Sequence, residues 1–465
     1  MKKRTILMAV LIVLASGTGY AEDLLTIYHQ ALEADPELKS SEVKSQIGTA
    51  QKGQALGAML PQVTGTGNWS TNKQESGRQV DDYTGTRYVV SLNQTLLDFP
   101  KFWNWRRAKS VENQYSLENV ESQHALLFNV VEKYFDVLEA DDELSFFNSE
   151  KEITEQQLEQ IQKLFDRQLV KITDLYALES RLDQVKASII ESEAKLVTAK
   201  ESLKELTNTS PVSLLKLRDE IEYKELEGKL EDWLAVARSE NPTLAAQQQA
   251  IEAADHDVAT QKSRHLPVVE LQLNYYNTDT GFQSARTGQT ETQVAAINVN
   301  VPFFSGGVTT RQTQEAQYKL TLNKYDKEAK IRALTKETSD AFLNSNASVR
   351  RIKATRKALE SASKSREAME TGFGYGAETM NDVLDAQQEE FSVMRDLAKA
   401  KYSYVKNRMR FMQAIGMISE DNLTEVNGWL QIATAQDHKE SINSKEQLST
   451  KKPLPKESLP KTKQN

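Results

Sequence analysis

The sequence predicts an α plus β membrane protein in which long helices alternate with four β-strands and the whole plan occurs twice. A helical period of 3.6 residues changes abruptly to a strand period of two at Pro61, and again at Pro267. Pro36 and Pro61 are 25 positions apart, as are Pro242 and Pro267, and the two pairs are offset by 206 positions (36 to 242 and 61 to 267). Equal spacing at two landmarks indicates an internal duplication.

The first residues have the pattern of a secretory signal. Lys2, Lys3 and Arg4 precede an apolar run from Ile6 to Ala15, and cleavage is expected after Ala21. This run is too short to span a bilayer as a helix, and no later stretch is long enough. Removing the signal lowers the formal net charge from −8 to −11. An acidic exported protein is not expected to bind nucleic acid.

The composition provides few groups for site chemistry. Cysteine is absent, so disulfides, thiolate metal sites and cysteine nucleophiles are excluded. The five histidines are scattered without metal-ligand spacing. The glycine-rich residues 372–376 lie between two predicted helices with no strand before them, so they predict a turn rather than a nucleotide loop. We expect no cofactor and no enzymatic activity.

The first half reads as helix over 23–58, interrupted at Pro36, followed by two strands at about 62–72 and 88–95. In each strand apolar and polar residues alternate, which predicts one apolar face. The polar residues 73–87 between the strands predict a loop. A helix of about 66 residues follows, from Phe102 to Arg167, with a length of about 100 Å.

This helix breaks near residues 168–173 and returns as a second helix. Its core positions, apolar except for Ser192, step 3, 4, 3, 4 without a slip, which is the repeat of a left-handed coiled coil rather than of an ordinary amphipathic helix. These positions are Leu175, Leu178, Leu182, Val185, Ile189, Ser192, Leu196, Ala199, Leu203 and Leu206.

The second half repeats this order. A helix over 233–263 precedes a strand from Val268, a loop over 277–289 and a strand containing Ile297. A long helix from about 311 to 370 and a return helix over 379–415 with a weaker heptad follow. After residue 436 the chain is rich in Lys, Ser, Gln and Pro and is expected to be disordered. The predicted segments are a signal peptide (1–21), helices (22–60), a β-hairpin (61–100), long coiled-coil helices (101–206), a connecting region (207–232), helices (233–264), a second β-hairpin (265–307), long coiled-coil helices (308–415), a connecting region (416–435) and a tail (436–465).

The strands predict a β-barrel in an outer membrane, because strands of about ten residues with one apolar face match barrel geometry. Four strands cannot close a barrel, and open edges cannot face lipid. Several copies must therefore contribute strands. Two copies would give eight strands and a filled interior, and three would give twelve and room for a pore. The alternative is a soluble helical protein with two hairpins, which the signal peptide and the aromatic residues near the strand ends disfavour.

In its motifs and their order the chain resembles the TolC family of outer-membrane efflux proteins over about residues 22–430. The motifs are Asp35-Pro36-Glu37-Leu38, Leu60-Pro61-Gln62, Ile172-Thr173-Asp174, His265-Leu266-Pro267, Pro302-Phe303-Phe304-Ser305-Gly306-Gly307 and Asp382-Val383-Leu384-Asp385-Ala386. The resemblance implies a homotrimer with a twelve-stranded barrel in the outer membrane lipid and a helical tunnel in the periplasm. It also implies a periplasmic adaptor and an inner-membrane pump or ABC transporter as partners.

The resemblance places a gate at the two helical breaks, far from the strands. Asp382 and Asp385 match the acidic ring of the family's periplasmic entrance. Their i, i+3 spacing puts both carboxylates on one helix face. Six carboxylates around a narrow hole would favour cations and raise some of their own pKa values. Without the resemblance, two solvated helix carboxylates would be the ordinary interpretation.

The predicted gate departs from the family pattern at its latch. Asp174, which follows Thr173, matches the residue that accepts the hydrogen bonds and ion pairs between helices of the family's closed gate. In the family the partners of this residue are a tyrosine and an arginine. Phe373 and Glu378 stand in those places. Phe373 has no hydroxyl to donate and Glu378 would repel Asp174, so we expect a looser resting state or one held by other pairs.

The predicted contact site for the adaptor departs from the family pattern in one of the two helical breaks. Gln168 replaces a glycine that the family often carries in its first turn, whereas Gly376 keeps the counterpart in the second. We still expect an adaptor to bind at this end. The predicted function is a passive exit duct for small molecules and/or polypeptides, in a tripartite efflux pump or a type I secretion system. The alternative is a structural coiled-coil protein of the envelope that forms no pore.

Overall fold

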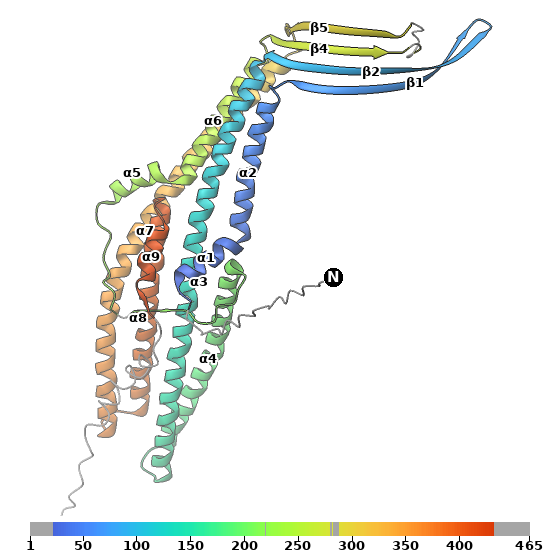
Figure 1. Cartoon of the computed structure of the whole chain (residues 1–465). Coiled ribbons are helices and arrows are strands. Elements are labelled where there is room, and N and C mark those ends of the chain that lie inside the picture. Colours follow the sequence, from blue (N-terminus) through green and yellow to red (C-terminus); the bar gives the residue numbers. More distant parts are fainter. Residues whose placement is uncertain (1–21, 219, 280, 282–287, 432–465) are drawn as a thin grey trace, which may run out of the picture.

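The computed structural model of the full chain describes residues 22–218, 220–279, 281 and 288–431. The predicted signal peptide and the tail from residue 436 lie outside these residues. Figure 1 shows a long helical column with a four-stranded sheet projecting from one end. Among the described residues, no helix combines the length and the apolar character that crossing a membrane would need.

The order of elements repeats, as the duplication predicts. The described helices are α1 (Leu24–Ala34), α2 (Pro36–Gly57), α3 (Phe99–Asp166), α4 (Ile172–Thr207), α5 (Leu230–Glu240), α6 (Pro242–Ser263), α7 (Val308–Gly374), α8 (Met380–Ala414) and α9 (Glu420–Asn427). The strands are β1 (Gln62–Ser76), β2 (Gln79–Leu97), β3 (Lys216–Leu217), β4 (Val268–Thr278), β5 (Thr290–Asn300) and β6 (Leu430–Gln431). The unit α2-β1-β2-α3-α4 therefore has its counterpart in α6-β4-β5-α7-α8.

The repeated prolines begin matching helices. Pro36 starts α2 and Pro242 starts α6, and both helices have 22 residues. Proline suits the first helical position because the missing N–H has no partner there. The residue before each proline caps the helix: Asp35 accepts from the Leu38 N–H at 2.7 Å, and Asn241 accepts from the Thr243 N–H at 3.0 Å. The cap at Asn241 separates α5 from α6, so the helical residues predicted over 233–264 form two helices that meet at the repeated proline.

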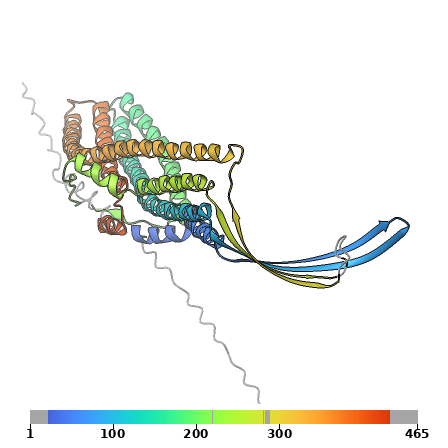
Figure 2. The ribbon, with the colours of Figure 1, turned by 90° about the horizontal axis from the view of Figure 1, so that it is seen from above.

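The large sheet is antiparallel with the strand order β1-β2-β4-β5. Its register aligns the predicted apolar positions across strands: Leu92 lies opposite Val63 on one side and Leu273 on the other. Trp69 on β1 is 81% exposed, so the apolar face is uncovered in the single chain. Figure 2 shows the sheet curving away from the helices. Within the described chain, β1 pairs only with β2 and β5 pairs only with β4, so each of these outer strands has one edge without a partner strand.

The predicted loop over 73–87 is instead part of the first hairpin. Ser76 pairs with Gln79 across a two-residue turn, and Lys73 pairs with Asp82 farther along the ladder. Gly77 has a positive φ of 63°, which lets the chain reverse this tightly. Polar side chains did not prevent strand formation because the ladder is made by backbone groups. In the second hairpin β4 ends at Thr278 and β5 begins at Thr290. Most of the loop predicted over 277–289 lies outside the described residues.

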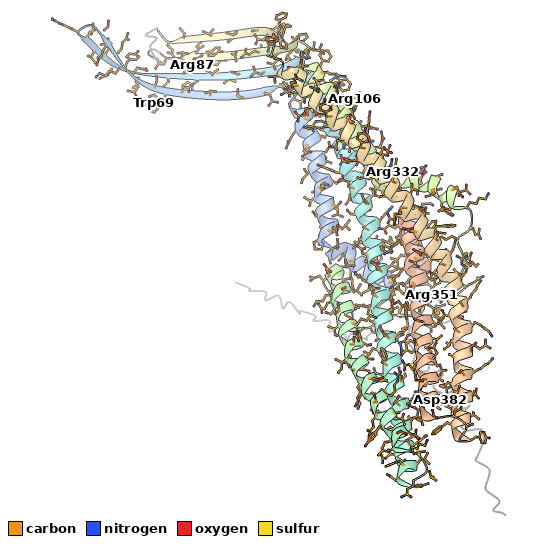
Figure 3. All side chains as sticks on the ribbon, turned by 180° about the vertical axis from the view of Figure 1, so that it is seen from behind. Trp69, Arg87, Arg106, Arg332, Arg351 and Asp382 are labelled. Atoms are coloured by element: carbon orange, nitrogen blue, oxygen red, sulfur yellow. The ribbon has the colours of Figure 1, made fainter. Side chains whose placement is uncertain are left out.

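The four longest helices lie side by side in the order α7, α8, α3, α4 (Figures 1 and 3). Leu178, Leu182 and Val185 of the predicted coiled-coil stripe are buried between α4 and α3. The main core lies about half-way along the column, where α1, α9 and the β3-β6 pair pack on α3 and α8. Tyr134 and Phe135 of α3 are fully buried there.

Candidate functional site

Two turns form the end of the column that is farthest from the sheet. One joins α3 to α4 and the other joins α7 to α8 (Figure 1). They share one backbone geometry: Gln168 has φ +62° and Gly376 has φ +74°. The Leu169 N–H bonds to the Leu164 carbonyl at 3.0 Å, and the Ala377 N–H bonds to the Gly372 carbonyl at 2.9 Å. Both helices thus end in a left-handed C-terminal cap, and Gln168 and Gly376 occupy equivalent positions.

The helices that leave the turns begin alike as well. Asp174 accepts from the Lys171 N–H at 3.2 Å, and Asp382 accepts from the Thr379 N–H at 2.9 Å. Each aspartate is the third residue of its helix and satisfies a backbone donor before the helix start. The Thr379 hydroxyl and then its N–H hold the pKa of Asp382 below its ordinary value. Asp382 therefore has a structural role as a cap, for which Thr379-x-x-Asp382 is the sequence signal.

Asp382 lies near the tip of the column (Figure 3). Asp385 follows three residues later in α8, and both aspartates are exposed. Between them Val383 and Leu384 are buried. Asp385 makes no ion pair within the part of the chain that the structure describes. No cluster of potential metal ligands was found among the described residues. The Asp385 carboxylate and the second oxygen of Asp382 are thus available to whatever faces this side of the tip.

The helix pair α3-α4 and the helix pair α7-α8 each form a coil, and the tips of these two coils pack on each other through apolar side chains. Ile161 of α3, Leu175 of α4 and Val383 of α8 belong to one buried cluster. Phe373 packs against this cluster and is half-buried. No hydrogen bond or ion pair joins Asp174 to Phe373 or Glu378 among the described residues. Apolar packing thus occupies the place where the resemblance implied a polar latch.

Of the remaining predicted tip residues, Thr173 and Glu378 are both exposed. The Glu378 side chain lies over Gly372, where an added Cβ would be 2.6 Å from the Glu378 Cγ. A residue larger than glycine at 372 would therefore displace Glu378.

A buried carboxylate links the two coils farther from the tip, and sequence reasoning did not find it. Glu150 of α3 is 1% exposed and pairs with Arg181 of α4. Its second oxygen accepts from Arg395 of α8 at 3.2 Å. The Arg395 guanidinium also lies over the Phe147 ring, 4.5 Å from its centroid. This arrangement, here called the Glu150 cluster, joins helices from both halves of the duplication.

Two amide contacts adjoin the Glu150 cluster on the side of the tip. Gln157 of α3 donates to Gln387 of α8 at 2.9 Å, and Arg181 donates to Gln388 at 2.9 Å. Gln387 is buried. A usable sequence signal existed: Glu150 and Gln157 are seven residues apart in α3, and Gln387 interrupts the predicted heptad of α8. Polar residues at core positions of a heptad mark places where helices are specifically paired.

Ionic contacts between α3 and α8 continue toward the centre of the column. Lys406 of α8 donates to Asp136 at 2.9 Å and to Glu139 at 3.0 Å. Burial lowers the pKa of Lys406, but the two carboxylates outweigh this effect, so the pKa is raised overall. Closer to the sheet, Arg410 pairs with Glu132 at 3.1 Å. The α3–α8 contact is thus ionic as well as apolar along much of its length.

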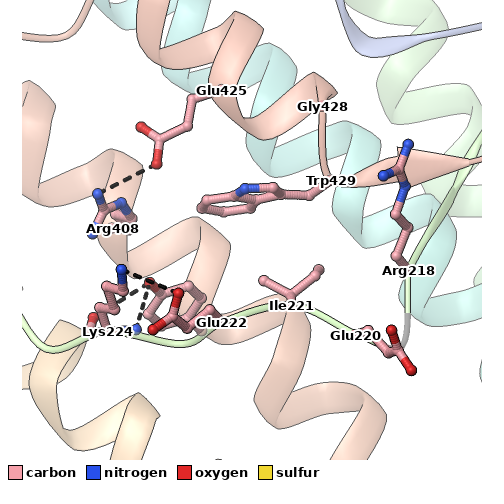
Figure 4. A pocket seen from close by; sticks show the side chains of 10 residues that line it. Arg218, Glu220, Ile221, Glu222, Lys224, Arg408, Glu425, Gly428 and Trp429 are labelled. Atoms are coloured by element: carbon pink, nitrogen blue, oxygen red, sulfur yellow. Dashed lines mark hydrogen bonds and ion pairs between the residues drawn. The ribbon is translucent and has the colours of Figure 1, made fainter.

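A cavity of about 270 Å³ lies near the β3-β6 pair (Figure 4). Trp429, Tyr404 and Arg218 are among its lining residues. Arg408 pairs with Glu425 across it at 3.5 Å, and Lys224 pairs with Glu222 at 3.1 Å. Its acidic and basic groups largely neutralise one another, so we assign it no binding role.

Comparison with known proteins matches these features to a single family. Residues 27–209 and 233–417 match the model of the family described as outer membrane efflux protein. The chain is 29% identical to the outer membrane protein TolC of Vibrio cholerae over 423 residues, which covers 90% of this chain and 96% of that protein. It is 26% identical to the alkaline protease secretion protein AprF of Pseudomonas aeruginosa over 431 residues, which covers 90% of this chain and 89% of that protein.

Solved structures share the fold. The Campylobacter jejuni CmeC outer membrane channel has a TM-score of 0.77 at 15% identity, with 89% of this chain and 90% of that chain covered. A CusC structure has a TM-score of 0.76 at 18% identity, with 85% and 92% covered. The duplicated helix-hairpin-helix plan and the matches over both halves lead to one conclusion: this chain belongs to the outer membrane efflux protein family, a family of outer-membrane transport proteins that are not enzymes.

Proposed function

We propose that three copies of the chain form a passive exit duct, with a twelve-stranded barrel in the outer membrane and a helical tunnel in the periplasm. The observation that carries this proposal is the four-stranded sheet, in which β1 and β5 each leave one edge unpaired in the described chain. An unpaired strand edge is too costly to remain in lipid, so neighbouring copies must pair edge to edge. The exposed apolar face with Val63 and Trp69 then contacts lipid.

The duct works with an inner-membrane pump or ABC transporter and a periplasmic adaptor. The relatives support both an efflux and a secretion role, because they include alkaline protease secretion protein AprF and cation efflux system protein CusC. The cargo is therefore small molecules and/or polypeptides. The adaptor binds at the tips, where Gln168, Thr173, Gly376 and Glu378 lie at or beside the two turns.

The gate lies at the tips. In a trimer, Asp382 and Asp385 from three copies place six carboxylates around the entrance, which favours cations. The apolar cluster of Ile161, Leu175 and Val383 holds the coils together, and the Glu150 cluster holds them higher in the column. Opening separates the α7-α8 coil from the α3-α4 coil. The gate is thus a two-state packing element rather than a chemical site.

The alternative function is a structural envelope protein whose coiled coils space other components and form no pore. Single-channel conductance of the purified full chain in a planar bilayer distinguishes the two. A duct gives discrete cation-selective openings. Bilayers that stay silent even after the tips are removed, for example by replacing residues 160–182 and 368–388 with short linkers, would support the structural protein.

A further inference from the structure

The start of α3, which directly follows β2, is basic and aromatic. Residues 99–111 contain no acidic residue, although the whole chain has a formal net charge of −8. Their basic residues are Lys101, Arg106, Arg107 and Lys109, and they include two of the five tryptophans of the chain. Acidic residues return at Glu112 and Glu118. Figure 3 shows Arg106 at the end of the column that adjoins the sheet, so the positive charge of α3 is confined to this end.

One face of this segment is open to solvent. Its residues step 4, 3, 4 along α3 and therefore share one side of the helix. They are Phe102, Arg106, Lys109 and Asn113, here called the α3 stripe, and all four are exposed. On the opposite face Asn104 and Arg107 are half-buried, and the Arg107 guanidinium donates to the Asn104 side-chain oxygen at 2.9 Å.

Helices of the same chain flank α3 on both sides. On one side Lys52 of α2 pairs with Glu112 at 2.5 Å. On the other side Trp103 packs on His256 of α6, with ring centroids 5.6 Å apart. In this part of the column α2 and α7 are the outer helices, so neighbouring copies of the proposed trimer meet there rather than at α3. The α3 stripe therefore stays uncovered when copies associate.

The two cations of the α3 stripe have no anionic partner in the described chain. The Arg106 guanidinium lies over the Phe102 ring, 5.5 Å from its centroid. The Trp105 ring centroid is 6.1 Å from that of Phe102, which extends the aromatic surface. Neither Arg106 nor Lys109 forms an ion pair or hydrogen bond with another residue that the structure describes. Two positive charges thus stand beside an aromatic surface without a carboxylate that holds them.

We propose that the α3 stripe binds the anionic headgroups of phospholipids in the periplasmic leaflet of the outer membrane. This inference rests on the proposed function, which puts the sheet in the membrane and the helices below it. Arg106 and Lys109 lie about 10 and 15 Å from the start of α3. Helical side chains lean toward the N-terminus, which for α3 is toward the sheet, and long basic side chains reach farther in that direction. Both charges thereby come to the level of the headgroups.

The crowding of the two free faces of α3 assigns the stripe to the outer wall of the tube. Side chains spread apart on the convex wall of a tube and crowd together on its concave wall. The α3 stripe is exposed throughout, whereas the face with Asn104 and Arg107 is half-buried. The stripe therefore continues downward from the lipid-facing side of the sheet, and the half-buried face lines the tunnel.

The side chains of the α3 stripe match the chemistry of an anionic lipid. A guanidinium donates two parallel hydrogen bonds to a phosphate, and an ammonium one turn away adds a second charge. Aromatic rings such as Phe102 and Trp105 favour the level at which apolar chains meet water. A zwitterionic headgroup carries its own cation, which competes with Arg106 and Lys109 for the phosphate. The stripe should therefore prefer lipids with a net negative charge.

Lipid titration of the purified full chain in detergent tests this preference. Phosphatidylglycerol should raise the melting temperature more than phosphatidylcholine at the same concentration, because a ligand that binds the folded state stabilises it. For Arg106→Gln/Lys109→Gln we expect the affinity for phosphatidylglycerol to fall by about fivefold for each lost charge. Each melting temperature is compared with that of the same variant without lipid. An equal rise with both lipids, or an unchanged affinity in the double variant, would overturn the proposal.

The matched control removes two charges with the same spacing elsewhere in the column. Arg350 and Lys353 are exposed on α7, and the neighbouring Arg351 lies about half-way along the column (Figure 3). Arg350→Gln/Lys353→Gln should keep the response of the natural chain to phosphatidylglycerol. A loss equal to that of the Arg106→Gln/Lys109→Gln variant would show a general charge effect and overturn the assignment to α3.

Two further comparisons identify the source of the phosphate and the role of charge. Inorganic phosphate in place of lipid should give no comparable rise, and an equal rise would mean a site for free anions instead. The charge-conserving variant Arg106→Lys/Lys109→Arg should retain most of the response, which separates loss of charge from loss of structure. The response should also shrink as salt rises from about 0.05 to 0.5 M, because salt screens exposed charges.

Conductance separates failure of this inference from failure of the proposed function. A chain that forms cation-selective channels in a planar bilayer but shows no preference for phosphatidylglycerol overturns the lipid site and leaves the duct intact. A chain that forms no channel, even without its tips, and responds to neither lipid overturns both.

Discussion

Glu150 of α3 and Arg395 of α8 form an ion pair at 3.2 Å between residues that are 245 positions apart in the chain. The Glu150 side chain is 1% exposed, and its other oxygen is held by Arg181. A buried carboxylate is stable when both of its oxygens are paired, and it is costly when a partner leaves. The coils therefore cannot part at this height without exposing Glu150 to water or leaving a charge unpaired.

Replacing Glu150 by alanine should loosen the resting gate. It leaves Arg181 and Arg395 without their carboxylate, and we expect the contact between the coils to weaken by about 3 kcal/mol, the lower end for a buried pair because both arginines are partly exposed. The channel should open more often, which single-channel recordings would detect. The matched control is Glu152→Ala, two residues along on the exposed side of α3, which should change stability by less than about 0.5 kcal/mol. Equal open probabilities in the two variants would remove the Glu150 cluster from the gate.

The variant Asp382→Asn/Asp385→Asn should lower the cation preference of the pore. Asparagine is preferable to alanine because its carbonyl oxygen can still accept from the Thr379 N–H and keep the start of α8 intact. We expect the reversal potential in a salt gradient to move toward zero while the trimer persists. Asp396→Asn, farther from the tip on the exposed side of α8, should have a smaller effect. An unchanged reversal potential in the double variant would exclude the acidic ring.

The left-handed turns predict effects of opposite sign at neighbouring glycines. Gly376 has φ +74° and open space around its Cα, so Gly376→Ala should cost about 1 kcal/mol from backbone strain alone. Gly374 lies in α7 with equally open space, and Gly374→Ala should stabilise the helix by roughly 0.5 to 1 kcal/mol. In the first turn, Gln168→Gly should relieve the strain at φ +62°. Thermal unfolding of the three variants measures these differences, and a stabilising Gly376→Ala would show that the turn differs from the one described.

The contact between α3 and α8 should weaken at alkaline pH. The pKa of Lys406 is raised above its ordinary value of 10.5 in the folded chain, because the stabilising effect of Asp136 and Glu139 exceeds the effect of burial. A raised pKa contributes stability that is complete below pH 10.5 and is lost as pH rises through the folded value. Lys406→Met should therefore reduce the fall in melting temperature between about pH 10 and pH 12. The control Lys399→Met, at an exposed site on the same helix, should leave the fall unchanged.

The sequence predicted correctly those helices whose start or packing face depends on residues close together in the chain. Pro36 and Pro242 fixed matching helix starts, and the 3-4 stripe through Leu178 and Leu182 predicted the coiled-coil seam of α4. The prediction of a loop over 73–87 was wrong. The polar residues there were taken as a sign of irregular structure, but a backbone hydrogen-bond ladder and a tight turn at Gly77 extend the hairpin through them.

The site was predictable only in part, for a similar reason. The sequence indicated the two turns and the acidic pair, and the structure brings both to one end of the column. The capping role of Asp382 was also readable, because Thr379-x-x-Asp382 is a capping-box pattern, but the acidic-pair interpretation did not use it. The sequence could not pair Glu150 with Arg395, because that contact depends on the relative height of two helices from different halves of the chain.

The central claim is that the gate opens by separation of the two coils of each copy. A reversible link between them tests this claim most directly. Gln157→Cys/Gln387→Cys places thiols at two side chains that are in contact, and a short cleavable thiol cross-linker can join them in the Glu150→Ala background. We predict that cross-linking returns the open probability to the closed level and that cleavage restores the openings. Openings that persist unchanged after complete cross-linking would contradict the account.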